Sequence, residues 1–327
     1  MMLPLSRSRA LGITWLLGLL LVPAIVRAQE GAGRGFTPED ALDVRTVRIQ
    51  DVSENGTWIA ATVQRHRDRL GIDHERFGDP TYVAPSLNEV LVVNTRSGET
   101  HSLFDSPVIA STFSWSPDGS RLAFIVYVDN AFRLMLYDVE RDELKIVDPR
   151  SNLEIASNSA LDWRPDGGAV LVGFRPEGWA EEARSAYRAL TEGPIVVQDS
   201  ENDFLAWDAV RKASADMIIA IVTLSDGAVR EIVPVAPVQQ PQFSEDGSFI
   251  TYMAANRLRT SYERAGGTEY EIFQVDLSGG EPRSVHPATE QRLRPIWSEA
   301  GDAFAYDKEG NVFVRRLSAD SALNLTE

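Results

Sequence analysis

Cysteine is absent from this chain of 327 residues. Its absence excludes disulfide bonds, thiolate nucleophiles and zinc sites that use cysteine ligands. It also excludes lipid attachment to a mature N-terminal cysteine. The folded state must therefore be stabilised by packing.

Histidine is scarce, and the motif of a serine nucleophile is missing. The four histidines, His66, His74, His101 and His286, contain no His-x-x-x-His metal pair, and we interpret them as surface or hairpin residues. The sequence has no Gly-x-Ser-x-Gly motif, so the strained turn that exposes a catalytic serine has no candidate. We therefore predict no catalytic residue, no metal site and no cofactor.

Positive charge is also in deficit. The chain has 32 Lys and Arg against 48 Asp and Glu, which gives a formal net charge of −16. Nucleic acids and anionic membranes would repel such a surface. We therefore expect neither as a partner.

Long apolar runs are missing except near the N-terminus, where the pattern is that of an export signal. Two arginines precede an uncharged stretch from Leu11 to Val22, and Val26-Arg27-Ala28 resembles a signal-peptidase site. The apolar core is shorter than the roughly 20 residues that span a bilayer. We predict cleavage after Ala28, no stable membrane span afterwards, and a periplasmic or secreted protein; the alternative is an uncleaved anchor. The predicted organisation is a signal peptide at 1–28, a linker at 29–40 and a single folded domain at 41–327, whose architecture the repeats below predict.

Five tight turns between apolar segments dominate the rest of the sequence, and the clearest lies in Trp115-Ser116-Pro117-Asp118-Gly119. In such a turn proline presets φ, aspartate bonds its own backbone and glycine accepts a positive φ. The residues to which we assign this turn role are Gly56, Pro117, Asp118, Gly119, Pro165, Asp166, Gly167, Asp246, Gly247 and Gly301. Because turn formation accounts for the recurring aspartates, we assign them no metal.

The spacing of these turns predicts the architecture. The glycines are 63, 48, 80 and 54 residues apart, near or above the roughly 40 to 50 residues of a four-stranded propeller blade. Apolar runs such as 122–127 follow the turns, and further strand pairs such as 134–138 and 143–147 follow them. A β-sandwich would lack this self-similarity, and an α/β fold would need a helix between most strands.

We therefore predict an all-β fold, a β-propeller of about five to seven four-stranded blades whose ring is either closed or incomplete. One short helical insertion is predicted at 175–189. A degenerate sixth turn is predicted at 201–207.

Two segments resemble a known family. Phe36-Thr37-Pro38-Glu39-Asp40-Ala41-Leu42 and the first turn segment, 52–60, resemble the start of the N-terminal propeller of secreted prolyl oligopeptidase family serine peptidases, of the dipeptidyl peptidase and acylaminoacyl peptidase kind. The later turn copies are similar to repeats shared with TolB-like periplasmic proteins. In that family a propeller caps an α/β-hydrolase domain, which we expect to be absent from these residues.

The resemblance implies one binding site, on the helical insertion. Dipeptidyl peptidases of the family hold the free amino terminus of a peptide with paired glutamates on such a helix, which implies this role for Glu181 and Glu182. Two carboxylates supply charge-assisted acceptors for an ammonium group. The tryptophan-rich turn motif of those enzymes does not follow the pair, and the alternative is a solvated helix face near Arg184 and Arg188.

Three functions remain open at this point. The resemblance implies a non-catalytic, exported propeller that gates or docks peptide substrate, with the peptide, a hydrolase domain or another protein as partner. The alternative is a stand-alone TolB-like scaffold that binds proteins through its loops. A third is a propeller enzyme whose carboxylates, histidines or arginines converge in a central channel.

Overall fold

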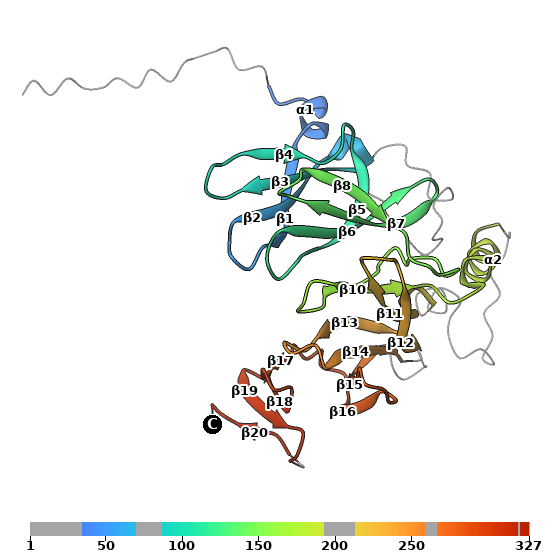
Figure 1. The fold of residues 1–327 in the computed structure, drawn as a ribbon. Coiled ribbons are helices and arrows are strands. Elements are labelled where there is room, and N and C mark those ends of the chain that lie inside the picture. The colour runs from blue at the N-terminus through green and yellow to red at the C-terminus, as the bar shows by residue number, and fades with distance from the viewer. Residues whose placement is uncertain (1–34, 70–86, 193–212, 259–266, 320, 327) are drawn as a thin grey trace, which may run out of the picture. The chain divides into compact units, whose positions relative to one another are not determined.

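The computed structural model describes residues 35–69, 87–192, 213–258, 267–319 and 321–326. These residues contain five consecutive four-stranded antiparallel units, which we call blades 1 to 5 (Figure 1). All five belong to one compact unit, Glu39–Glu327. The predicted all-β propeller with four-stranded blades is confirmed. The predicted signal peptide, His74 and the proposed sixth turn at 201–207 lie outside the described residues.

Within each blade the strands pair in the order in which they occur in the chain. Blades 1 and 2 are in addition joined into one sheet by pairing of β3 with β5. Blade 1 contains β1 (Arg45–Val52), β2 (Trp58–Arg65), β3 (Leu87–Asn94) and β4 (Thr100–Ser102). Blade 2 contains β5 (Val108–Trp115), β6 (Arg121–Val128), β7 (Ala131–Asp138) and β8 (Glu143–Val147). Blade 3 contains β9 (Leu161–Trp163), β10 (Ala169–Phe174), β11 (Met217–Thr223) and β12 (Val229–Ala236). Blade 4 contains β13 (Val238–Phe243), β14 (Phe249–Arg257), β15 (Thr268–Asp276) and β16 (Arg283–Thr289). Blade 5 contains β17 (Ile296–Trp297), β18 (Ala303–Lys308), β19 (Asn311–Arg316) and β20 (Leu323–Asn324).

Each of the five glycine turns joins the first strand of a blade to the second. In blade 2, Asp118 Oδ1 accepts hydrogen bonds from the Ser116 hydroxyl at 2.6 Å and from the Ser120 backbone N–H at 3.0 Å. These bonds hold the pKa of Asp118 below its usual value because they favour the carboxylate. Gly119, at φ 71°, donates its N–H to the Ser116 carbonyl at 2.8 Å. The aspartate therefore closes the turn on its own backbone.

The connection from the second strand to the third is the one that varies in length. In blades 2 and 5 it is a two-residue turn, Asp129–Asn130 and Glu309–Gly310, with positive φ at every position. In blades 1, 3 and 4 it spans 66–86, 175–216 and 258–267. The insertions of blades 1, 3 and 4 therefore lie at the end of each sheet that is opposite the glycine turn.

Helices α1 (Pro38–Leu42) and α2 (Trp179–Thr191) and the 3-10 helix η1 (His66–Arg69) accompany the blades, and residues 213–215 are also helical. The predicted helix at 175–189 is confirmed as α2, but it starts four residues later. Gly178, at φ 78°, interrupts the helical backbone directly before Trp179. None of the helices described is long and apolar enough to cross a membrane.

Neighbouring blades pack face to face, largely through apolar side chains. In each pair the same face of the earlier blade meets the same face of the later one. The residue four positions after the turn glycine points toward the next blade along the chain, and we call that side the leading face. The residue three positions after the glycine lies on the opposite side, the trailing face. For example, Ala123 on the leading face of blade 2 packs in one cluster with Val170 on the trailing face of blade 3.

Two aspartates tie neighbouring blades together through the backbone. Asp51 of blade 1 accepts a hydrogen bond from the N–H of Trp115 in blade 2, at 2.7 Å. Asp162 of blade 3 accepts one from the N–H of Phe243 in blade 4, at 2.6 Å. Each aspartate lies five positions before a turn glycine. Burial raises the pKa of Asp162 to about 6.

Candidate functional site

Part of the interface between blades 4 and 5 departs from the apolar pattern of the others, although Ile272 and Val285 of blade 4 pack in one apolar cluster with Phe304 of blade 5. On the leading face of blade 4 the position four residues after the turn glycine is Thr251, and its partner across the sheet is Gln274. Gln274 is in turn paired with Arg283 on β16. The corresponding pair is Ala123 with Leu136 in blade 2 and Leu171 with Ile221 in blade 3. A polar row, Thr251–Gln274–Arg283, thus runs across blade 4. Only Thr251 and Gln274 depart from the earlier blades, because the position of Arg283 is Lys145 in blade 2 and Arg230 in blade 3.

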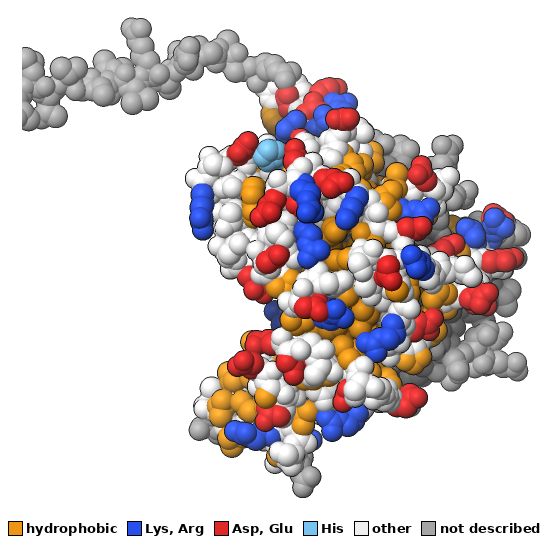
Figure 2. All heavy atoms as spheres, viewed as in Figure 1, with side chains coloured by type: hydrophobic (Ala, Val, Ile, Leu, Met, Phe, Trp, Pro, Cys, Tyr) orange, Lys and Arg blue, Asp and Glu red, His pale blue; other side chains and the backbone are white. Residues whose placement is uncertain are grey.

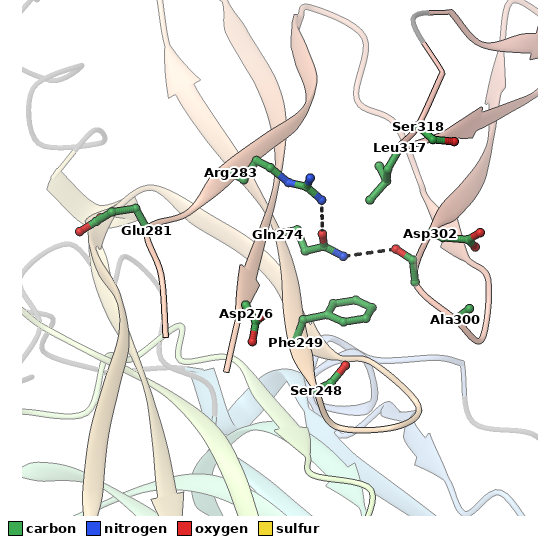
Figure 3. Close-up of a pocket in the computed structure, with 11 residues that line it drawn as sticks. Ser248, Phe249, Gln274, Asp276, Glu281, Arg283, Ala300, Asp302, Leu317 and Ser318 are labelled. Atoms are coloured by element: carbon green, nitrogen blue, oxygen red, sulfur yellow. Dashed lines mark hydrogen bonds between the residues drawn. The ribbon is translucent and has the colours of Figure 1, made fainter. Parts of the chain in front are cut away.

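A cavity of about 750 Å³ lies at this polar row, at the turn end of blades 4 and 5 (Figure 3). We call it the seam cavity. Its lining comes from the turn before β14, the ends of β15 and β16, the turn before β18 and the segment after β19. The lining residues are Ser248, Phe249, Gln274, Asp276, Glu281, Arg283, Ala300, Gly301, Asp302, Leu317 and Ser318.

A chain of hydrogen bonds crosses the seam cavity. Arg283 Nη2 donates to Gln274 Oε1 at 2.6 Å, and Gln274 Nε2 donates to the Gly301 carbonyl of blade 5 at 3.2 Å (Figure 3). The amide thereby fixes the position of the guanidinium group relative to blade 5. Beneath this chain the Phe249 ring lies against Gly301 and contacts the ring of Trp297, with centroids 6.4 Å apart. The cavity therefore offers an apolar floor beside oriented polar groups.

Three carboxylates surround this arrangement, against the single guanidinium group of Arg283. They belong to Asp276, Glu281 and Asp302, all of which are exposed. The backbone N–H of Ser278 donates to Asp276, which holds the pKa of that carboxyl below its usual value. With three anionic groups and one cationic group, the lining favours a ligand that carries positive charge.

The predicted pair Glu181 and Glu182 lies elsewhere, on the first turn of α2. Both side chains are exposed. Trp179 holds the start of the helix, since its Nε1 donates to the Ala213 carbonyl at 3.0 Å and its ring stacks on the Arg175 guanidinium at 4.0 Å. The structure therefore presents the two carboxylates to solvent from an anchored helix end.

A second cavity, of about 350 Å³, lies beside α2, between blades 2 and 3. Arg133, Arg175 and Arg184 line it together with Asp148 and Glu154, but the two glutamates of α2 do not. Arg175 is buried, and its guanidinium donates to backbone carbonyls and to Asn158. Its role is therefore to hold the segment that follows the helical insertion.

The described histidines occupy three unrelated places. His66 is exposed in η1, and His101 lies in β4 with Nε2 3.5 Å from a carboxylate oxygen of Glu99. His286 in β16 is half-buried against the Tyr306 ring, and this burial lowers its pKa. Within the described part of the chain no group of three or more His, Asp or Glu is placed to hold a metal ion.

Sequence reasoning missed the seam cavity. Thr251 interrupts a largely apolar strand, but Gln274 and Arg283 lie in strands that contain several other polar residues, so the sequence offered little signal. The three residues lie 23 and 9 residues apart in sequence, and only the strand register places them in one row across the sheet. That register, and the facing turn of blade 5, cannot be derived from hydrophobic alternation.

Comparison with known proteins gives matches in structure only. No protein-family description and no curated protein matches the sequence. Among solved structures, the chain is similar to a prolyl endopeptidase from a study of two such enzymes, with a TM-score of 0.52 and 14% identity over 87% of this chain and 37% of that chain. It is similar to the acylaminoacyl peptidase of Pyrococcus horikoshii, with a TM-score of 0.50 and 13% identity over 86% of this chain and 39% of the other. TolB of Acinetobacter baumannii gives a TM-score of 0.48 and 13% identity over 85% and 54% of the two chains.

The chain thus spans little more than a third of the length of the two peptidases and about half that of TolB. At such identities the likeness is one of fold. The resemblance that the repeats indicate is confirmed at that level.

Proposed function

We propose that this chain is a non-catalytic, exported β-propeller that docks peptide substrate, as a propeller domain does beside the hydrolase domain of a prolyl oligopeptidase-like peptidase. The observation that carries the proposal is the seam cavity, beside which Thr251 and Gln274 replace a pair that is apolar in blades 2 and 3. Departures from a repeated packing rule occur where a protein uses the position for function.

The groups in the seam cavity fit a peptide. Peptide N–H and C=O groups need both acceptors and donors, which the carboxylates, Arg283 and Gln274 supply. Phe249 and Leu317 add apolar contact for one side chain. The acidic lining selects a segment that contains lysine or arginine.

We therefore expect a fluorescein-labelled peptide rich in lysine to bind the full chain more tightly than a glutamate-rich peptide of the same length. The double variant Asp276→Asn/Glu281→Gln should weaken binding of the basic peptide about three- to tenfold, because exposed charge pairs contribute about 0.2–1 kcal/mol each. Fluorescence anisotropy titrations measure both effects, and added salt should weaken the basic peptide's binding.

The matched control is Glu245→Gln/Glu299→Gln, which removes the same charge from exposed turn positions outside the cavity lining. It should leave the affinity within about twofold of the parent value. Equal losses in both double variants would contradict docking in the seam cavity. Mass spectrometry of the recovered peptide should find it intact, whereas cleavage would contradict a non-catalytic role.

For the glutamates of α2 we propose the role that the resemblance implies, to hold a peptide's free amino terminus. Glu181→Gln/Glu182→Gln should weaken binding of a free-amino peptide about tenfold, the equivalent of about 1.4 kcal/mol. Binding of the same peptide with an acetylated terminus should be unchanged. Glu177→Gln, an exposed glutamate just before the helix, is the control. A variant that lowers the affinity for both peptides equally would refute a role in terminus recognition.

A second candidate function is that of a protein-binding scaffold. It is favoured by the apolar side chains that blades 1 and 5 expose, since contiguous exposed apolar surface marks interaction sites. The peptide titrations above separate the two, because a scaffold would not distinguish basic from acidic peptides through Asp276 and Glu281.

A further inference from the structure

A further cavity between blades 4 and 5, of about 170 Å³, lies at the first strands of the two blades. We call it the first-strand cavity. Gln240 and Gln242 line it from β13, Thr251 lines it from β14, and Arg294 and Trp297 line it from the segment that leads into and forms β17. The seam cavity shares none of its described lining residues, so the two cavities are separate places.

The polar side chains of the first-strand cavity have no protein partners within the described part of the chain. The Arg294 guanidinium forms no hydrogen bond or ion pair there, and the amides of Gln240 and Gln242 form no hydrogen bond. Thr251 is only 3% exposed, and its hydroxyl is likewise without a partner. Each of these groups can donate a hydrogen bond, and a guanidinium group can only donate. The cavity therefore offers several donors that a ligand could use.

The described lining of this cavity contains no carboxylate. The chain has 48 Asp and Glu against 32 Lys and Arg, and acidic and basic side chains are interspersed over the face shown in Figure 2. The seam cavity follows this trend, with three carboxylates around one guanidinium group. The first-strand cavity departs from it, because the charge of Arg294 is not balanced by an acid in the lining. Its field therefore attracts anions.

A comparison of equivalent tryptophans shows what the cavity replaces. Trp163 lies four positions before the turn glycine of blade 3, and its indole N–H donates to the Ser114 carbonyl of blade 2 at 2.9 Å. Trp297 has the same position in blade 5, but its indole N–H, like that of Trp115 in blade 2, is buried with no acceptor among the described residues. The counterpart of Ser114 in blade 4 is Gln242. The cavity that Gln242 and Trp297 line therefore lies where a direct hydrogen bond joins blades 2 and 3.

Apolar side chains complete the walls of the first-strand cavity. Met253 and Ile272 are direct partners across β14 and β15, and each is 2% exposed. Pro295 adds an apolar group from the segment before β17. Small-molecule sites combine such walls with a few polar groups that fix the orientation of the ligand. The volume corresponds to about six water molecules of the liquid, which is room for a carboxylate group with a short hydrocarbon tail.

We propose that the first-strand cavity binds a small monocarboxylate with an apolar tail. The Arg294 guanidinium binds the carboxylate, because charge-assisted hydrogen bonds of this kind are stronger than those between neutral groups. Gln242 and Thr251, which are direct partners across β13 and β14, donate further hydrogen bonds to its oxygens. The tail packs on Met253 and Ile272. This inference does not rest on peptide docking, since the seam cavity has a different lining and the opposite charge preference.

The test compares two probes of the same size, 4-methylpentanoate and its neutral amide, 4-methylpentanamide. Saturation-transfer difference NMR of the full chain should give a millimolar dissociation constant for the carboxylate, in keeping with a ligand of about eight non-hydrogen atoms. The amide should bind at least tenfold more weakly, because it has no charge for Arg294 to bind. No saturation transfer to the carboxylate, or equal binding of the two probes, would overturn the proposal.

Substitutions locate the site. Arg294→Gln should weaken binding of 4-methylpentanoate about three- to tenfold. The matched control is Arg292→Gln, which removes the same charge from an exposed arginine two residues earlier that does not line the cavity, and it should stay within about twofold of the parent. Equal affinities in the two arginine variants would mean that only general electrostatic attraction operates, and the proposal would fail.

Thr251→Val provides a test that leaves the charge unchanged. It removes the buried hydroxyl and keeps the shape of the side chain, so it should weaken binding of the carboxylate about threefold or more. The unfolding midpoint should not fall, because the hydroxyl has no protein partner to lose. A Thr251→Val protein that binds like the parent would contradict the assigned site. Inorganic phosphate at the same concentration should not displace the probe, and displacement would refute the preference for a carboxylate with an apolar tail.

Discussion

Replacing Gly301 with alanine should destabilise the protein by about 2–5 kcal/mol, one of the two largest effects that we expect. Gly301 has a φ of 65°, where an L-residue costs roughly 1–2 kcal/mol. A β-carbon there would also overlap the Phe249 ring, and overpacking of this kind costs about 1–3 kcal/mol. The ring would have to leave Gly301 and lose its contact with Trp297. Urea denaturation followed by tryptophan fluorescence measures the loss.

The chain contains its own control for this substitution. Gly56 has the same φ of 65°, but a β-carbon there would meet no atom within 4 Å. Gly56→Ala should therefore cost only the backbone contribution of about 1–2 kcal/mol. Adding Phe249→Leu to Gly301→Ala should recover part of the difference. Equal destabilisation by the two alanines would mean that the aromatic overlap is relieved without cost.

Replacing Asp162 with asparagine should change how stability depends on pH. Burial raises the pKa of Asp162 to about 6, above its ordinary value of 3.8. Between these values the folded chain retains a proton that the unfolded chain has lost, so stability falls as the pH rises. In total, ionisation of Asp162 in the folded chain lowers the free energy of unfolding by about 3 kcal/mol. Asparagine cannot ionise, yet its carbonyl oxygen can still accept the N–H of Phe243.

We therefore expect Asp162→Asn to be more stable than the parent above pH 6 by up to about 3 kcal/mol, with the difference shrinking toward pH 4. Denaturant titrations of both proteins across this range measure the difference. Asp166→Asn, four residues along, should show the opposite trend. The guanidinium group of Arg164 holds the pKa of Asp166 below its usual value. The ionised carboxylate of Asp166 therefore stabilises the fold, and this stabilisation is lost as the pH falls and the carboxylate is protonated. A stability difference that is constant with pH in Asp162→Asn would refute the assignment.

The hairpins were predictable from the sequence because their determinants are local. Gly119 and Asp118 define a turn through contacts within five residues. A glycine with positive φ recurs in all five turns, although the residue before it is Asn55 in blade 1 and Ala300 in blade 5. The helical insertion was predicted for the same reason, although its start was not. The helix starts directly after Gly178, whose φ of 78° is not helical, and Trp179 at its first position bonds to the carbonyl of Ala213, 34 positions later.

The contacts between blades were not predictable, because they join residues far apart in sequence. Asp162 bonds to the backbone of Phe243, 81 positions later, and the only local hint is an acidic residue between two apolar ones. Gln274 likewise reaches Gly301, in the next blade. Glu181 and Glu182 illustrate the reverse case, in which a short motif suggests a role that depends on surroundings that the motif does not specify.

The length variation between second and third strands has a consequence for how this protein can change. At one end of each sheet a turn with a glycine at positive φ joins the first two strands, while the other end carries either two residues or a longer connection. Recognition segments can therefore be gained, lost or exchanged at that end without resetting the hairpins. A foreign loop grafted between Asp129 and Asn130 would enter blade 2 where blades 1, 3 and 4 already carry theirs.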